Sequence, residues 1–158
     1  MLRFNLLFHS DEIAPKPEDY NLDAGFIYHQ LPTTKGMFYY KEHFKGDRLS
    51  AKHTCQNLNS NLPIPKNWQQ NNFFSNFFDP PFWLGISRDL GDDGNIYNNF
   101  RGDDGYIFLS YRWKGWADGE PNNKDGDEDG VEMIENGYWN DENGSIKLRF
   151  YCVFVIPN

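Results

Sequence analysis

The order of the predicted elements indicates an α+β domain. Two helical patterns lie in the first half of the chain, and short apolar strands follow them without alternating with further helices. The chain has 158 residues, the usual size of one domain. Aromatic residues make up 18% of it, a content that disordered chains lack. We therefore expect one folded domain with its helices and strands in separate parts of the chain.

The helices are predicted from apolar residues at helical spacing. Ala51 and Cys55 belong to a stripe at i, i+4, i+7 and i+11 that predicts a helix over residues 50–58, closed by the prolines that follow. A second helix is expected over residues 67–77, where Phe73 and Phe77 form an i, i+4 pair. We expect the phenylalanines of this second helix to belong to the core.

The strands are predicted from short aromatic and β-branched runs. The first 36 residues read as a terminal strand and an irregular extension, packed on or leading into a domain over residues 37–158. Residues 87–106 have the composition of a loop. Strands are expected at 37–40, 82–86, 106–109 and 111–113 (as a strand or hairpin), 131–134, 137–139 and 150–155.

The negative charge is concentrated in one segment. The net charge of the chain is -8, and residues 117–142 hold ten acids against a single lysine, so this segment alone carries -9 and the remainder +1. Such a balance excludes a nucleic-acid-binding face, which must be basic. A solvated acidic loop is one interpretation. The glycines, asparagines and tryptophans within the segment favour another, a site for a hard cation with oxygen ligands.

An EF-hand in this segment, a catalytic site and a membrane span are each poorly supported by the sequence. Residues 125–130 begin like an EF-hand loop, but Asn136 stands where that loop needs a bidentate glutamate. No nucleophile elbow, phosphate-binding loop or zinc-protease spacing is present, and the histidines all lie in the first third of the chain. No apolar run reaches the ~18 residues of a membrane span. We therefore expect a binding protein that is not an enzyme and has no membrane span.

Three motifs in the acidic region occur in an order and spacing typical of one family, with a cysteine in the first helix, a central Trp-Leu-Gly-Ile strand and a cysteine in the last strand around them. The residues are Trp116-x-x-Gly119-Glu120-Pro121-Asn122-Asn123, Glu128-Asp129-x-Val131-Glu132, Trp139-Asn140-Asp141, Trp83-Leu84-Gly85-Ile86, Cys55 and Cys152. Over residues 37–155 the chain thus resembles the C-type lectin-like domain.

The resemblance implies a C-type lectin-like fold with two helices, short, mostly antiparallel strands and a long calcium-binding loop region. It implies a primary calcium site that also binds sugar, and a cis Glu120–Pro121 bond. Carboxylate and amide oxygens suit calcium, and a sugar hydroxyl can donate to a carboxylate and accept from an amide. The Glu-Pro-Asn order implies mannose, fucose or N-acetylglucosamine, sugars with equatorial 3- and 4-hydroxyls. The implied ligands are Glu120, Asn122, Glu128, Asn140 and Asp141.

The resemblance also implies features around this site. Cys55 and Cys152 are expected to form the outer disulfide of the family. The positions of the family's inner disulfide hold Gly130 and Gly144. Without that second bridge, the long loop region is expected to depend more on calcium for its order. Asn143 begins a formal glycosylation sequon, and the sequence leaves its modification open. A second, auxiliary calcium ion would use some of Glu128, Asp129, Asn123, Asp89, Asp92 and Asp93, although the last three are equally well explained as turn residues.

These features predict a function without chemistry. We expect calcium-dependent carbohydrate binding by a secreted protein or the ectodomain of a surface protein, because a disulfide and a calcium module suit that compartment. The expected partners are glycans or glycoproteins, and an oligomer would add avidity. The alternative is a structural or interaction protein of the same fold, such as an ice-binding or protein-binding member, in which the metal-binding residues persist without sugar recognition.

Overall fold

The structure is a computed structural model of the chain, described here over residues 16–30, 37–88 and 100–156. Two α-helices lie near the middle of the chain, and short 3-10 helices connect several strands. The elements in order are the 3-10 helix η1 (Pro17–Tyr20), β1 (Ile27–Gln30), β2 (Met37–Gly46), α1 (Arg48–Asn57), α2 (Trp68–Phe77), β3 (Phe82–Arg88), β4 (Phe100–Gly102), η2 (Lys124–Gly126), β5 (Gly130–Met133), η3 (Glu135–Gly137), β6 (Trp139–Glu142) and β7 (Leu148–Val155).

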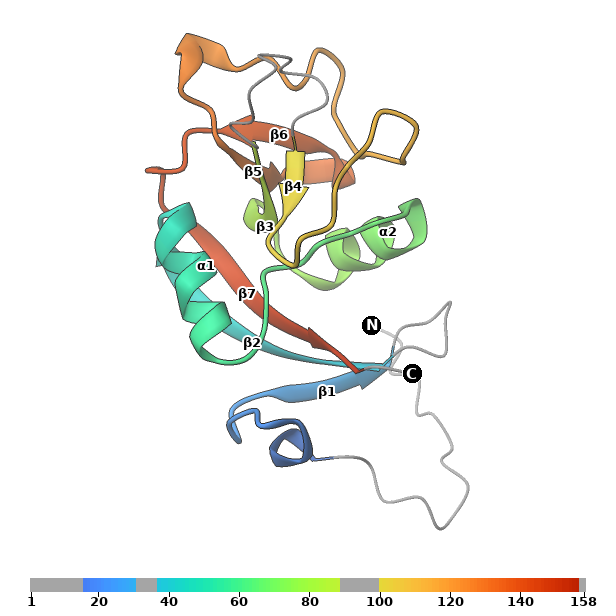
Figure 1. Cartoon of the computed structure of the whole chain (residues 1–158), viewed down its shortest axis with the longest axis vertical. Coiled ribbons are helices and arrows are strands. Elements are labelled where there is room, and N and C mark those ends of the chain that lie inside the picture. Colours follow the sequence, from blue (N-terminus) through green and yellow to red (C-terminus); the bar gives the residue numbers. More distant parts are fainter. Residues whose placement is uncertain (1–15, 31–36, 89–99, 157–158) are drawn as a thin grey trace.

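The strands form one sheet in two parts. Its order is β1-β2-β7-β3-β5-β6, with β4 paired to β3, and the pairs are antiparallel except for β3 with β7. Strands β1, β2 and β7 lie at one end of the molecule, and strands β3 to β6 lie above them with the acidic segment at the top (Figure 1). This arrangement confirms the predicted fold, with two helices and mostly antiparallel strands.

Helix α1 is fixed at its start and on its buried face. The side chain of Asp47 caps it by accepting the backbone N–H of Ser50 at 2.9 Å. Ala51 and Cys55 are fully buried, and Cys55 is joined to Cys152 of β7 by a disulfide with an S–S distance of 2.06 Å. The predicted helix and disulfide are therefore confirmed, although the helix ends at Asn57, before the prolines that were expected to close it.

Helix α2 supplies the aromatic part of the core. Asn67 caps it by accepting the backbone N–H of Gln70 at 2.9 Å. The rings of Phe73 and Phe77 stack with centroids 5.2 Å apart, as the i, i+4 spacing predicts. Both rings pack against the core, where the apolar side chains of β3, the strand predicted from residues 82–86, have exposures near zero.

The N-terminal extension is packed against the domain where the structure describes it. Strand β1 pairs antiparallel with β2, with Ile27 opposite Tyr40. Leu22 and Phe26 are 5% and 4% exposed and belong to the same buried cluster as the disulfide. Residues 16–30 thus extend both the sheet and the core.

Three strand predictions need correction. Residues 106–113 form irregular chain with a turn at residues 110–111, and not a strand or hairpin; one bridge, Arg101 with Ile107, joins them to the sheet. The ammonium group of Lys114 donates to the carbonyl of Leu109 at 2.7 Å and to two others nearby, which holds the chain in a turn. Within the expected loop, residues 100–102 form β4, and the strand expected at 137–139 begins at Trp139 as β6.

In the parts of the chain described here, neither α-helix has the length and hydropathy to cross a membrane.

Candidate functional site

The candidate site lies where strand β6 meets the acidic loop, which is the part of the acidic segment before β5, residues 117–129. Trp139 anchors this strand: its indole N–H donates to the side-chain carbonyl of Asn71 in α2 at 2.7 Å. The backbone of Trp139 also bonds to the neighbouring loop, donating to Gly115 at 2.8 Å and accepting from Ala117 at 3.0 Å. These bonds hold the loop that leads to Glu120 beside β6.

Asp141 is the centre of the site. Its side chain has an exposure of 0%, and each of its oxygens accepts a backbone N–H of the acidic loop, Asn122 at 3.0 Å and Asn123 at 2.8 Å. The second oxygen also pairs with the guanidinium group of Arg88, 2.6 Å away. A buried carboxylate needs such partners, because burial without them carries a large free-energy cost.

Glu120 and Asn122 lie on either side of Pro121. The Glu120–Pro121 peptide bond is cis, as the resemblance implied. The carboxylate of Glu120 accepts the backbone N–H of Asn122 at 3.1 Å and its side-chain N–H at 3.0 Å. Burial first, and then the neighbouring carboxyl group of Asp141, raise the pKa of Glu120 to about 7. The groups around Glu120 and Asp141 thus do not fully compensate the negative charge of these two carboxyl groups.

Glu128 adds a third carboxyl group to the same region. It is 8% exposed, and its side chain accepts the backbone N–H of Lys124 at 2.8 Å. Burial, and then the charge of Asp141 and other nearby carboxylates, raise the pKa of Glu128. The charges of Glu120, Glu128 and Asp141 therefore act on one another, which is the electrostatic setting of a cation site.

Asn140 faces a residue to which the sequence prediction assigned no role. Its side-chain N–H donates to the carboxylate of Glu132 at 2.9 Å, and the two residues are register partners across β5 and β6. Glu132 is 7% exposed, and burial raises its pKa. A glutamate inside the apolar run from Val131 to Met133 is the signal that points to such a buried role.

The five predicted primary ligands come to one end of the molecule. Four of them, Glu120, Asn122, Glu128 and Asp141, have side-chain oxygens that accept hydrogen bonds from protein groups. Within residues 16–30, 37–88 and 100–156, no three His, Cys, Asp or Glu side chains converge as they would around a metal ion. Backbone N–H groups and Arg88 hold Asp141, and Asn140 bonds to Glu132. The donor set nevertheless fits calcium, because all five side chains offer oxygen and three are carboxylates.

The predicted auxiliary residues are not gathered in the same way. Asn123 accepts the backbone N–H of Glu128 at 3.2 Å, while Asp129 accepts the backbone N–H of Gly144 at 2.9 Å. These oxygens are thus directed to separate partners of the loop. The other three predicted auxiliary ligands, Asp89, Asp92 and Asp93, lie outside the described residues.

The two glycines at the expected positions of an inner disulfide, Gly130 and Gly144, both lie beside Arg48. Besides its bond to Asp129, Gly144 accepts the backbone N–H of Arg48 at 2.8 Å. A Cβ on Gly130 would lie 2.9 Å from Trp83 and 3.4 Å from the Arg48 stem, and one on Gly144 would lie 3.4 Å from that stem. The side chain of Arg48 thus packs beside both glycines.

The sequon asparagine has contacts on both sides of its amide. The side-chain N–H of Asn143 donates to Asp127 at 2.7 Å, and its carbonyl accepts the hydroxyl of Ser145 at 2.7 Å. Its modification is not decided by these contacts and stays a prediction.

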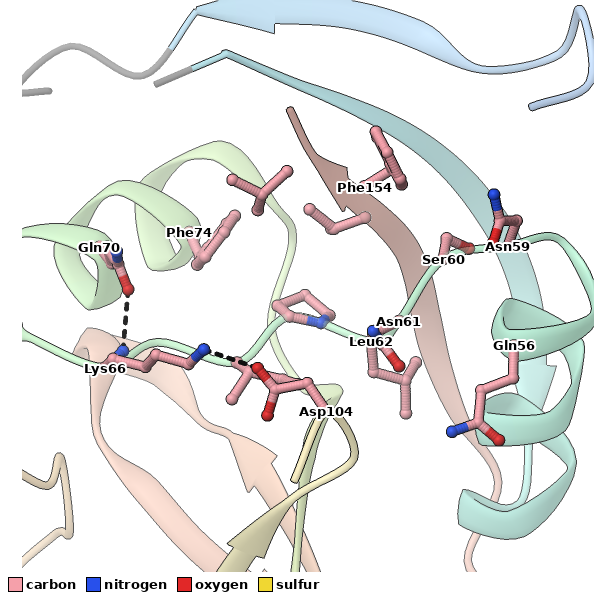
Figure 2. A pocket seen from close by; sticks show the side chains of 14 residues that line it. Gln56, Asn59, Ser60, Asn61, Leu62, Lys66, Gln70, Phe74, Asp104 and Phe154 are labelled. Atoms are coloured by element: carbon pink, nitrogen blue, oxygen red, sulfur yellow. Dashed lines mark hydrogen bonds and ion pairs between the residues drawn. The ribbon is translucent and has the colours of Figure 1, made fainter. Parts of the chain in front are cut away.

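A cavity lies away from the acidic loop. It has a volume of about 550 Å³ and is bordered by the segment after α1, the start of α2 and the end of β7. Figure 2 shows Lys66 at its edge, with its ammonium group 2.6 Å from Asp104. The residues that line it include none of the five predicted calcium ligands. Its wall mixes amide and apolar side chains, and it lacks the carboxylate grouping of the acidic site.

Known proteins share both sequence and fold with this chain. The family model of the lectin C-type domain matches residues 49–154. Human collectin-10 is 26% identical over 131 residues, which are 78% of this chain and 43% of that protein. Collectin-10 of Xenopus tropicalis is 44% identical over 43 residues, 27% of this chain and 16% of that protein. The chain thus spans less than half the length of these curated relatives.

Solved structures show the same fold at lower identity. The cow C-type carbohydrate-recognition domain of CD23, determined in the presence of a GlcNAc2Man3 oligosaccharide, superposes with a TM-score of 0.66 and 24% identity, covering 86% of this chain and 97% of that one. A calcium-independent type II antifreeze protein superposes with a TM-score of 0.65 and 16% identity, covering 84% and 92%. Because the family model spans more than half of the sequence, the chain belongs to the C-type lectin domain family.

Proposed function

We propose that this domain binds carbohydrate in a calcium-dependent manner through the acidic loop and strand β6. The observation that carries the proposal is the link between two amide–acid pairs: the backbone N–H of Asn122, of the Glu120 pair, donates to the carboxylate of Asp141, of the Asn140 pair, at 3.0 Å. Two such pairs, joined by this bond, would offer the donors and acceptors that vicinal sugar hydroxyls need.

Calcium would be held by Glu120, Asn122, Glu128, Asn140 and Asp141. When bound, it would accept lone pairs from two sugar hydroxyls and neutralise part of the -9 charge of residues 117–142. The carboxylates would accept the hydroxyl protons, and the amides would donate to the hydroxyl oxygens. The order Glu120–Pro121–Asn122 supports sugars with equatorial 3- and 4-hydroxyls, that is mannose, fucose or N-acetylglucosamine.

The setting of this activity follows from the same features. A domain with one disulfide and a calcium site is suited to an extracellular place, as a secreted protein or an ectodomain. Its partners would be glycans or glycoproteins, and oligomers would raise the avidity of a weak single site. The relatives named collectin and the cow domain solved with an oligosaccharide support this proposal.

An ice-binding or protein-binding role is the second candidate. Exposed apolar side chains favour this role: Tyr111 and Trp68 are 79% and 60% exposed. The antifreeze protein of the same fold supports the same alternative. This role would need neither calcium nor sugar.

The test is a glycan array probed with the protein in calcium and in a chelator. We expect binding to mannose-type glycans in calcium and its loss in chelator. Asp141→Asn should abolish binding, whereas Glu135→Gln, which changes an exposed acid of η3 outside the predicted ligand set, should retain it. Thermal hysteresis without sugar binding would support the ice-binding role and overturn the carbohydrate proposal.

A further inference from the structure

A buried cation lies inside the acidic site. Arg88, the last residue of β3, is 7% exposed in its side chain, and its guanidinium group lies 2.6 Å from Asp141, whose side chain is 0% exposed. The same guanidinium group donates to the backbone carbonyl of Glu128 at 3.0 Å. One side chain therefore contacts two of the five predicted calcium ligands.

The backbone of Arg88 strengthens this connection. Its N–H donates to the carbonyl of Asp129 at 2.8 Å, so residues 128 and 129 are both bound to Arg88. The guanidinium carbon lies 4.8 Å from the ring centroid of the buried Phe100, which forms a favourable cation–π contact with it. A charged group buried at this depth needs its partners, because an unpaired charge there is very costly.

We propose that Arg88 is an internal cation that holds Asp141 and Glu128 in place before calcium arrives, and that it takes the place of a second metal ion. The calcium part of this inference rests on the proposed function. The planar guanidinium group can hold the loop and strand β6 at once with several N–H donors, which a hydrated ion cannot do without losing water. Arg88 thus acts by positioning the ligands.

The contacts of Asn123 and Asp129, two predicted auxiliary ligands that the structure describes, agree with this role. Asn123 and Asp129 use side-chain oxygens to bind backbone N–H groups of Glu128 and Gly144. The backbone carbonyl of Glu128 already accepts a hydrogen bond from Arg88 and is therefore not free to bind a second ion. We therefore expect one calcium ion per chain.

The experiment is hydrogen exchange measured by mass spectrometry over residues 117–142, with and without calcium. Wild type is compared with Arg88→Gln, which removes the charge, and Arg88→Lys, which keeps the charge but loses the planar group. Arg149→Gln is the matched control, because the pair of Arg149 with Asp79 is exposed, at 38% and 73%. Calorimetric titration with calcium alone gives the stoichiometry of wild type and each variant.

In chelator, we expect exchange in this segment to be on the order of tenfold faster in Arg88→Gln than in wild type. Arg88→Lys should lie between the two, and Arg149→Gln should match wild type. In saturating calcium, the difference between Arg88→Gln and wild type should shrink, because the ion then holds Asp141 and Glu128 through their carboxylates. Wild type should bind one calcium ion.

Three results would overturn the inference: unchanged exchange of Arg88→Gln in chelator, an equal acceleration with and without calcium, or two calcium ions bound by wild type. If Arg88→Gln does not fold, the exchange of Arg88→Lys and the wild-type stoichiometry decide. If wild type shows no calcium binding at all, the proposed function fails. The comparison in chelator still decides whether Arg88 holds the loop.

Discussion

Asn122 and Asp141 are 19 residues apart in the sequence, and the backbone N–H of the first donates to the buried carboxylate of the second at 3.0 Å. This bond places the acidic loop on strand β6. It also makes the stability of the site depend on Asp141, whose second oxygen is shared by Asn123 and Arg88. The first prediction follows from that dependence.

Asp141→Asn should destabilise the calcium-free protein strongly. The substitution keeps the size of the side chain but leaves Arg88 as an uncompensated buried charge, a change that typically costs about 3–5 kcal/mol. Chemical denaturation in chelator measures the free energy of unfolding. Asp79→Asn is the control, because Asp79 is 73% exposed and its pairing with Arg149 should contribute only about 0–1 kcal/mol. Equal effects of the two substitutions would contradict the central role of Asp141.

Asn71→Leu should destabilise the protein by removing the hydrogen bond that anchors Trp139 of strand β6. Asn71 is 7% exposed, accepts the indole N–H of Trp139 at 2.7 Å and donates to the carbonyl of Gly137 at 2.7 Å. Leucine leaves both groups unsatisfied, at about 1–3 kcal/mol for each buried group. Thermal or chemical denaturation measures the loss. Asn76→Leu, on the exposed face of α2, should change the stability by no more than about 0.5 kcal/mol.

Removal of the disulfide should lower stability without removing the fold's pattern of elements. Cys55 and Cys152 are 97 residues apart, and the chain-entropy model gives an upper figure of about 4–5 kcal/mol for a loop of that length. The measurement compares wild type with the double variant Cys55→Ala/Cys152→Ala by denaturation. Two free thiols in the unreduced wild-type protein would contradict the bridge.

The pH dependence of the calcium-free protein should carry the signature of Glu120. Its pKa is raised from an ordinary value of 4.5 to about 7, so the folded state binds a proton that the unfolded state has lost between these values. This group therefore destabilises the fold above pH 7 and does so less as the pH falls toward 4.5. Glu120→Gln should be more stable than wild type near pH 8, and the difference should shrink by pH 5.

Two histidines titrate in the same range but do not obscure this comparison. Burial lowers the pKa of His29 and of His43, so both contribute stability that is lost as the pH falls through their ordinary range. They are present in wild type and in Glu120→Gln, and their effect cancels in the difference. A difference that is constant from pH 5 to pH 8 would contradict the raised pKa of Glu120. With calcium bound, acid should instead weaken binding, because protons compete for the carboxylates.

Local patterns predicted most of the fold. The stripe through Ala51 and Cys55 and the pair Phe73–Phe77 mark buried helix faces, and each lies in a helix of the structure. The irregular chain at residues 106–113 was missed because aromatic residues suit both strands and packed turns. What decides between them is the contact of the Lys114 ammonium group with backbone carbonyls, which no periodicity reports.

The motifs predicted which residues lie close together, but not the contacts that surround them, and the ligand set itself stays a prediction. Motif spacing placed Asn122 and Asp141 in one site, and the structure joins them. Arg88 was not expected there, because a basic residue at the end of an apolar strand is usually exposed to solvent. Its burial depends on partners that are distant in the sequence. The same holds for Glu132, whose pairing with Asn140 depends on the register of β5 and β6.

Removal of calcium should lower stability in a way that simple linkage predicts. At a calcium concentration 100-fold above the Kd, binding to the folded state alone adds about 2.7 kcal/mol. Melting curves in calcium and in chelator measure this difference, and hydrogen exchange should assign it to residues 117–142. Identical melting curves in the two conditions would contradict the binding of an ion by the folded domain.

The most direct test of sugar recognition exchanges the acid and the amide around Pro121. Glu120→Gln with Asn122→Asp keeps one carboxylate and one amide, so calcium should still bind, but the order of donor and acceptor is reversed. Each mispaired hydroxyl should cost about 1–3 kcal/mol, against about -4 kcal/mol for a millimolar monosaccharide complex.

The measurement is calorimetric competition with mannose, fucose, N-acetylglucosamine and galactose, on wild type and on this double variant, in saturating calcium. We predict that wild type binds the first three sugars and that the variant keeps calcium, loses detectable mannose binding and shifts toward galactose. Wild type that binds none of the four sugars, or a calcium-bound variant that binds mannose unchanged, would contradict the account.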